Sequence, residues 1–112
     1  MAKLIVISWR DIPAQVIVKE GRATAKVPLS QRFQEAVDRA AMRAGRGSSD
    51  AYLADWKRSE PRACGENLAG EAAAEAARLE ARYSDADLER LIRAHGVAGN
   101  DAPAAPGVKD ER

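Results

Sequence analysis

The amino-acid sequence predicts an α+β fold, in which a three-stranded antiparallel sheet packs against about four helices. Two patterns predict it: β-forming residues and tight turns fill residues 1–28, whereas apolar residues recur at helical spacing over residues 30–96. Residues 97–112 contain Gly, Pro, Ala and charged residues without periodicity, which is typical of a disordered tail. We therefore expect a single domain over residues 1–96 and a disordered tail over residues 97–112.

Three strands are expected in the first part of the chain, over residues 3–9, 15–19 and 22–27. Gly21 can adopt a positive φ and so permits a tight hairpin turn before the third strand. That strand alternates polar and small apolar residues, which predicts one wet face. Pro28 then ends the sheet, and a sheet of this size needs a helix layer to be stable.

Four helices are expected after the sheet, because apolar residues recur there with helical periodicity between capping and stop signals. They run from the N-cap Ser30 to Gly45, from Asp50 to about Arg58, from Leu68 to Tyr83, and from the N-cap Ser84 to Gly96. Residues 61–67 are expected to be irregular, since a Glu-Pro pair ends the second helix. On the third helix, Glu75 is expected on the outer side, between Glu71 and Arg78.

Composition restricts both stability and location. Apolar residues make up 46% of the 112 residues, but aromatic residues only 4%, and Ala supplies much of the apolar share. Since burial contributes ~25 cal/mol per Å², small Ala side chains predict a thin core that is modestly stable or shared with a partner. A single Cys excludes an internal disulfide and indicates a reducing compartment, and no apolar run approaches the ~18 residues of a membrane span. The N-terminal segment has strand character rather than that of a signal peptide, so we expect a cytoplasmic protein.

Charge is distributed unevenly along the chain, although the net charge is +1. Lys and Arg exceed Asp and Glu by 5 in residues 1–48, and the acidic residues exceed the basic ones by 4 in residues 49–112. If the halves occupy different faces, a bipolar molecule results, which favours docking on a charged partner or head-to-tail self-association. The alternative is that opposite charges interleave on one surface.

The segment WRDIP, residues 9–13, predicts a corner between the first two strands. Trp9 either packs on its own domain or lies exposed as a binding anchor, since Trp and Arg are enriched in interface hot spots. Trp9, Arg10 and Asp11 are therefore our candidate partner-binding corner. On that hypothesis, replacing Trp9 and Arg10 by Ala weakens partner capture and leaves the circular dichroism spectrum near native.

Basic residues in the first half of the chain predict a second candidate surface. They are Arg32, Arg39 and Arg43 on one face of the first expected helix, and Lys19, Arg22 and Lys26 on the wet sheet face. Such a patch suits an acidic protein surface, with Arg39 and Arg43 as a partner-binding flank, or nucleic-acid phosphates. Against nucleic acid, Glu35 and Asp38 interrupt the helix and no series of aromatic residues offers stacking for bases. A plain solvated face is the third interpretation.

Cys64 is the candidate reactive thiol. It stands beside Gly65 at the foot of the third helix, a position that can favour thiolate chemistry. A nucleophile needs a base, however, and the chain's single His, His95, comes at the far end of another helix. One Cys and one His do not make a mononuclear zinc site without several carboxylates, and no phosphate-binding loop has Walker spacing. We therefore predict no catalytic residue, no metal and no cofactor, with an unreactive thiol as the simpler interpretation of Cys64.

Four segments together give the chain a family resemblance: WRDIPAQVIV, LSQRFQEAVDRAAMRAG, DAYLADWKR and CGENLAGEAAAEAARLEARY. With them, over residues 3–95, it resembles the bacterial "virulence factor" domain family, whose best-known namesake is the conserved virulence factor C group. That family's name records a phenotype, so no catalytic residues carry over. Longer members add an iron–sulfur scaffold-like segment and helical repeats, neither of which this sequence contains. Stand-alone members are often encoded near folate- and corrinoid-dependent methyl-transfer enzymes, so the resemblance implies an accessory subunit of one-carbon metabolism.

One principal hypothesis and two alternatives follow. The principal hypothesis is a non-enzymatic accessory or adaptor protein that docks on a larger enzyme. The resemblance implies a methyltransferase or a methylenetetrahydrofolate reductase-type enzyme as that partner. The first alternative is a small redox or thiol-dependent enzyme that uses Cys64, and the second is a nucleic-acid-binding module that uses the basic N-terminal half. A membrane partner is not expected, and a homo-oligomer is an open alternative.

Overall fold

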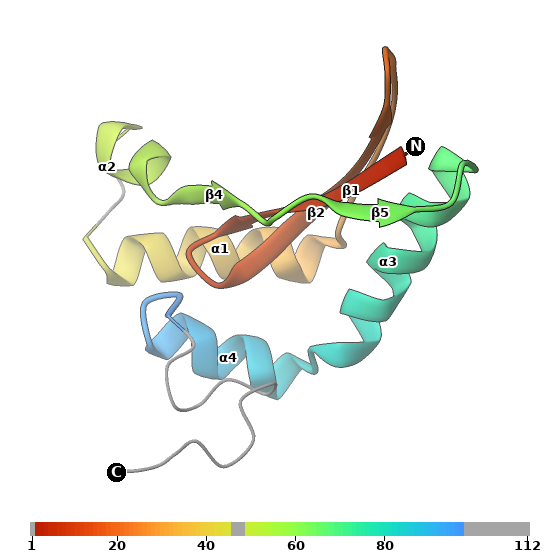
Figure 1. The fold of residues 1–112 in the computed structure, drawn as a ribbon. Coiled ribbons are helices and arrows are strands. Elements are labelled where there is room, and N and C mark those ends of the chain that lie inside the picture. Colours follow the sequence, from red (N-terminus) through yellow and green to blue (C-terminus); the bar gives the residue numbers. More distant parts are fainter. Residues whose placement is uncertain (1, 46–48, 98–112) are drawn as a thin grey trace, which may run out of the picture.

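The computed structural model describes residues 2–45 and 49–97, which form an α+β arrangement of strands and helices (Figure 1). The strands are β1 (Ala2–Trp9), β2 (Ile12–Glu20), β3 (Ala23–Pro28), β4 (Trp56–Arg58) and β5 (Arg62–Cys64). The helices are α1 (Gln31–Arg43), α2 (Ser49–Ala54), α3 (Leu68–Arg82) and α4 (Asp85–Arg93). None of these described helices is long and apolar enough to cross a membrane. Apart from Val97, the predicted tail 97–112 lies outside the described residues.

All five strands belong to one antiparallel sheet. Its order is β3-β2-β1-β4, and β5 also pairs with β1. The predicted α+β class, antiparallel sheet and four helices are confirmed, but the expected number of three strands is wrong. The predicted strands correspond to β1, β2 and β3, except that β2 begins at Ile12 rather than at residue 15. Pro13 is tolerated inside β2 because the pairing with β1 shifts its register there.

β4 and β5 lie along the same edge of β1, with residues 59–61 between them. Ser59 continues the pairing, because its N–H donates to the carbonyl oxygen of Val6 (2.9 Å) and its Oγ accepts the N–H of Val6 (2.9 Å). The helix predicted over 50–58 is therefore wrong in its second part, and the irregular segment predicted over 61–67 contains a strand. Strands of three residues are too short to show the alternation that predicts them.

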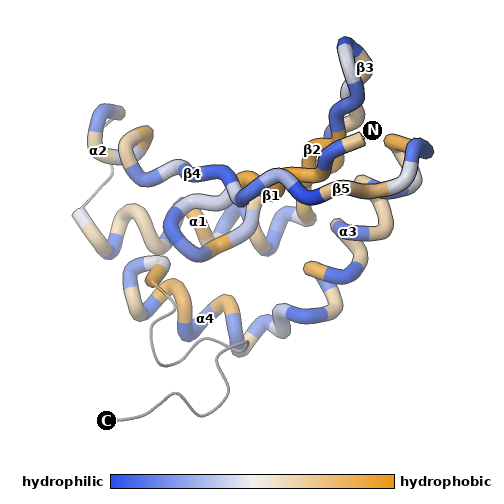
Figure 2. Tube along the Cα trace, in the orientation of Figure 1, coloured by the Kyte–Doolittle hydropathy of each residue, from blue (hydrophilic) through white to orange (hydrophobic). Residues whose placement is uncertain are grey.

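Three helices form a layer on one side of the sheet (Figure 1). α3 packs on β2 and β3, α1 packs on β2, and α4 packs on α1. Figure 2 shows hydrophobic and hydrophilic residues alternating along α3 and α4, as expected of helices with one buried face. Ala residues contribute much of that buried face, as the composition predicts: Ala36, Ala40, Ala41, Ala72 and Ala76. Among the described residues, no helix covers the opposite face of the sheet.

The helix ends follow the sequence signals in part. Ser84, the predicted N-cap, forms a capping box with Asp87 at the start of α4, and Gly45 and Gly96 follow α1 and α4 with φ values of +71° and +87°. Ser30 stands at the N-cap of α1, but its side chain makes no capping hydrogen bond. Instead, its N–H and hydroxyl donate to the carboxylate of Glu80 in α3 (2.6 and 2.9 Å). A carboxylate from another helix thus takes the capping role and joins the two helices.

Candidate functional site

Trp9 lies inside the corner between β1 and β2. Its side chain is 0% exposed, its Nε1–H donates to the backbone oxygen of Tyr52 (2.9 Å), and its ring stacks on that of Tyr52 at 6.1 Å between centroids. Gly96 also packs against the indole, since an ideal Cβ there would lie 2.8 Å from Cζ3. Packing of Trp9 on its own domain is therefore confirmed, and the alternative of an exposed anchor is wrong. The corner buries its aromatic ring because α2 and the end of α4 close over it.

Arg10 and Asp11 remain partly at the surface, but both are engaged by their own domain. The guanidinium of Arg10 pairs with Asp55 (3.2 Å) and donates to the backbone oxygen of His95 (2.9 Å). The carboxylate of Asp11 pairs with Lys57 (2.9 Å). Their polar atoms therefore hold the corner to Asp55 between α2 and β4, to β4 itself, and to the end of α4. A direct role of Arg10 and Asp11 in partner binding stays a prediction.

Opposite charges interleave on the helix side of the molecule. The arginines of α1 pair with carboxylates of α3 and α4 through Arg32–Glu80 (3.3 Å), Arg32–Asp85 (3.1 Å) and Arg39–Glu89 (3.4 Å). Of the two predicted arrangements of charge, the interleaved one holds here. The prediction of a single basic patch that combines these arginines with Lys19 and Lys26 is wrong, because the two groups lie on opposite sides of the sheet. A partner-binding role for Arg39, and for Arg43 in the last turn of α1, stays a prediction.

The face of the sheet turned away from the helices is here called the open face. Unlike the helix side, it combines an apolar centre with a rim of basic residues. The register places Ile5 opposite Ile17 on neighbouring strands, and residues directly opposite each other share a face. An isoleucine floor lies at its centre: Ile5, Ile7 and Ile17. A basic rim surrounds the floor: Lys3, Lys19, Lys26 and Arg58. Together with Thr24, the floor and three of the rim residues line a groove of about 280 Å³.

Within residues 2–45 and 49–97, no negative charge compensates the basic rim. No carboxylate among the described residues lines the groove, and none forms an ion pair with a rim residue. Lys3 and Lys19 lie directly opposite each other on β1 and β2, an arrangement of like charges that is unfavourable. The open face therefore combines an apolar centre with four cations that have no partner among the described residues.

Trp56 borders the open face and was missed by sequence reasoning as a site residue. It lies in β4, is half-buried, and its ring meets that of Tyr52 edge-on at 5.7 Å between centroids. With Ile7, Lys57 and Arg58 it lines a shallow hollow of about 180 Å³. The sequence predicted that Trp56 belongs to a helix that runs from Asp50 to about Arg58. Only the pairing of β4 with β1 brings it beside the open face.

Cys64 ends β5, where it is half-buried and pairs with Ala2 at the start of β1. His95 contacts the corner at the other end of β1 through its backbone oxygen. The two residues are thus separated by most of the length of β1, about 20 Å at ~3.3 Å per residue. His95 is therefore too far away to serve as a base for Cys64, and no group of His, Cys, Asp and Glu among the described residues is suited to hold a metal ion.

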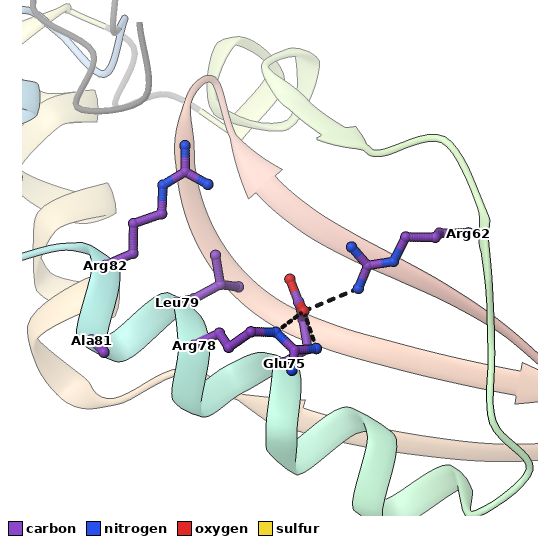
Figure 3. Close-up of a pocket in the computed structure, with 6 residues that line it drawn as sticks. All are labelled: Arg62, Glu75, Arg78, Leu79, Ala81 and Arg82. Atoms are coloured by element: carbon purple, nitrogen blue, oxygen red, sulfur yellow. Dashed lines mark hydrogen bonds and ion pairs between the residues drawn. The ribbon is translucent and has the colours of Figure 1, made fainter. Parts of the chain in front are cut away.

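Glu75 is the only buried charged side chain among the described residues, although the sequence placed it on the outer side of its helix. Its Oε1 accepts one hydrogen bond from Arg62 (3.0 Å) and two from Arg78 (2.9 and 2.6 Å), as Figure 3 shows. Burial raises the pKa of Glu75, but the hydrogen bonds and charges of Arg78 and Arg62 outweigh burial and hold that pKa below its usual 4.5. The outward placement was wrong because β5, which the sequence did not reveal, brings Arg62 over this face of α3.

Replacing Glu75 by Gln should make the domain less stable at neutral pH and less sensitive to acid. A carboxyl group whose pKa is lower in the folded state contributes stability above its unfolded pKa, and this contribution disappears as pH falls through the folded value. For Glu75 the loss begins below about pH 4.5 in the wild type and is absent in Glu75→Gln. Urea unfolding at pH 7 and at pH 3 measures the difference. Glu66→Gln at an exposed position is the control, and an unchanged pH dependence in Glu75→Gln would contradict the assignment.

Comparison with known proteins identifies one family match. No characterised protein and no solved structure is significantly similar to this chain. A family model described as "Virulence factor" matches residues 7–92, a range that includes α1, α2, α3, all but the last residue of α4, the WRDIP corner and the open face except Lys3 and Ile5. The resemblance carried by the WRDIP segment and the Ala-rich helices is confirmed by this match, and the chain belongs to the virulence factor family.

Proposed function

We propose that this protein is a non-enzymatic adaptor that docks on an acidic surface of a larger protein through its open face. The basic rim around the isoleucine floor, with no carboxylate partner among the described residues, is the observation that carries the proposal. Arg32 and Arg39 of α1 already have acidic partners within the domain, whereas the rim has none among the described residues. An acidic partner would supply the missing charges and cover the floor at the same time.

Both parts of the open face favour association with a protein. Complementary charge accelerates encounter and fixes orientation, while burial of Trp56 and of the half-buried Ile7 and Ile17 provides an apolar centre of the kind found in stable interfaces. A partner carboxylate near Lys3 and Lys19 also relieves the repulsion between these opposed lysines. Binding to the folded state adds stability, which suits a domain whose core relies on Ala.

Two other functions have less support. A nucleic acid would satisfy the rim with phosphates, but Trp56 is the only aromatic residue among the described ones that borders the open face. Proteins that bind single strands stack successive bases on several aromatic rings. A thiol-dependent enzyme stays a prediction that rests on Cys64 alone, since the structure does not bring His95 beside it.

The first partner to test is a folate- or corrinoid-dependent methyl-transfer enzyme, because the family resemblance implies one. This choice and the cytoplasmic location are predictions that belong to the proposal. The physical requirement is more general: the partner presents several carboxylates around an apolar centre, so that both the rim and the floor are covered.

Replacing Lys19 and Lys26 by Glu should reduce affinity for the partner at least tenfold, because two attractive contacts become repulsive. The tagged protein is first used to recover its partner from the native host, with identification by mass spectrometry. Isothermal titration calorimetry with the purified partner then compares wild type and variant at low and moderate salt. Affinity of the wild type should fall as salt rises.

Arg43→Glu is the matched control, since Arg43 is an exposed cation on the helix side. It should leave affinity unchanged. If Arg43→Glu weakens binding and the Lys19 and Lys26 substitutions do not, the helix flank is the interface and the proposal is wrong. Steep, salt-dependent retention of the wild type on DNA or RNA, without a protein partner, would support the nucleic-acid alternative instead.

A further inference from the structure

A second basic site lies in a pocket between α3 and β5 (Figure 3). It has a volume of about 530 Å³ and is lined by Arg62, Glu75, Arg78, Leu79, Ala81 and Arg82. Three guanidinium groups and one carboxylate leave the lining with two net positive charges. This excess of positive charge persists after the internal ion pairs have formed.

Glu75 fixes two of these guanidinium groups without consuming their hydrogen-bonding capacity. Arg62 donates one hydrogen bond to it and Arg78 donates two, whereas each guanidinium carries five N–H donors. The side chain of Glu75 is only 12% exposed, but those of Arg62 and Arg78 are 57% and 61% exposed. The arginines are therefore anchored on a buried carboxylate and still present N–H groups to solvent.

Arg82 adds a third cation one turn further along α3. It makes no ion pair with a carboxylate of the described residues, and its guanidinium lies 5.7 Å from the ring centroid of Tyr83. Leu79 and Ala81 contribute apolar wall to the same pocket. The pocket thus joins a cluster of N–H donors to a small apolar surface.

From this arrangement we infer that the pocket binds a small organic oxyanion, a phosphate monoester or a carboxylate, whose apolar part lies on Leu79 and Ala81. Planar guanidinium groups bind the oxygens of such anions in pairs, which fixes their orientation. Glu75 is a positioning residue: it orders Arg62 and Arg78 before the ligand arrives and so lowers the entropic cost of binding. The inference is independent of the proposed docking at the open face.

Phenyl phosphate and inorganic phosphate are the probes, used with the full chain at constant ionic strength. Nuclear magnetic resonance of the arginine Nε–H groups should show saturable shifts for Arg78 and Arg82 with both probes. Phenyl phosphate should bind several-fold more tightly, because its ring covers the apolar wall. Arg82→Gln should weaken binding about tenfold, since a charged hydrogen bond is lost, whereas Arg43→Gln on α1 should leave affinity unchanged.

Glu75→Gln separates positioning from simple attraction. Removing a negative charge strengthens anion binding if charge alone matters, but weakens it if the carboxylate holds the arginines in place, which is the result we expect. Circular dichroism verifies that each variant is folded. The inference is overturned if no saturable shift occurs up to tens of millimolar probe, or if Arg43→Gln weakens binding as much as Arg82→Gln. Equal affinity for both probes would show that Leu79 and Ala81 do not contact the ligand, which contradicts that part of the inference.

Discussion

Trp9→Ala is expected to lower the free energy of unfolding by about 3–5 kcal/mol, a large part of the ~5–15 kcal/mol typical of a native domain. The substitution removes the largest fully buried side chain and leaves a cavity between β1, α2 and the end of α4. It also removes the donor that satisfies the backbone oxygen of Tyr52. Urea unfolding followed by circular dichroism measures the loss. The hypothesis that a variant lacking Trp9 and Arg10 keeps a near-native spectrum is therefore abandoned.

Trp56→Ala is the matched control, because it removes the same side chain from a half-buried position. Its cost should be about 1–2 kcal/mol, while its effect on partner affinity should exceed that on stability. If the two substitutions destabilise the domain equally, Trp9 is not the centre of packing that its burial indicates. If Trp56→Ala leaves partner affinity unchanged, the hollow beside the open face is not part of the interface.

Gly96→Ala is expected to cost about 2–5 kcal/mol, for two separate reasons. An L-residue in the left-handed conformation costs about 1–2 kcal/mol, and Gly96 has a φ of +87°. Its new Cβ would also lie 2.8 Å from the ring of Trp9, and such overpacking costs about 1–3 kcal/mol. Thermal and urea unfolding report the total.

Gly45→Ala isolates the first of these effects. Gly45 follows α1 with a φ of +71°, but a Cβ there meets no atom within 4 Å. It should therefore cost only about 1–2 kcal/mol, from backbone strain alone. The difference between the two glycine variants measures the contact with Trp9. Equal costs would mean that the end of α4 shifts away from the indole without penalty.

Strong local signals made most of the fold predictable from sequence. Long β-forming runs, the turn at Gly21, helical stripes of apolar residues and the capping box at Ser84 all act within a few residues. β4 and β5 depend instead on their pairing with β1, which lies some fifty residues earlier in the chain. Three-residue strands have no periodicity of their own, so the neighbouring Tyr52 and Trp56 were assigned together to one helix.

The candidate site was harder to predict, because the side chains that form it are determined by which residues the fold buries and which it leaves exposed. The sequence marked Trp9 as a candidate anchor but contained nothing to show that Trp9 is fully buried whereas Trp56 is only half-buried. Lys19 and Lys26 were correctly placed on the wet sheet face, but their separation from the α1 arginines depends on which side of the sheet the helices take. Glu75 was misplaced for a related reason: its partner Arg62 comes from the unpredicted β5.

The hydrogen bonds at the corner join the beginning of the domain to its end. Arg10 reaches His95 across a separation of 85 residues, and the N–H of Asp11 donates to the oxygen of Gly96 (2.8 Å). Closing a loop of this length costs conformational entropy and is therefore slow. The contacts that offset this cost form only when α4 is present. During synthesis on the ribosome, the nascent chain therefore exposes the indole of Trp9 until residue 96 has emerged. Truncated products are expected to be substrates for chaperones and proteases.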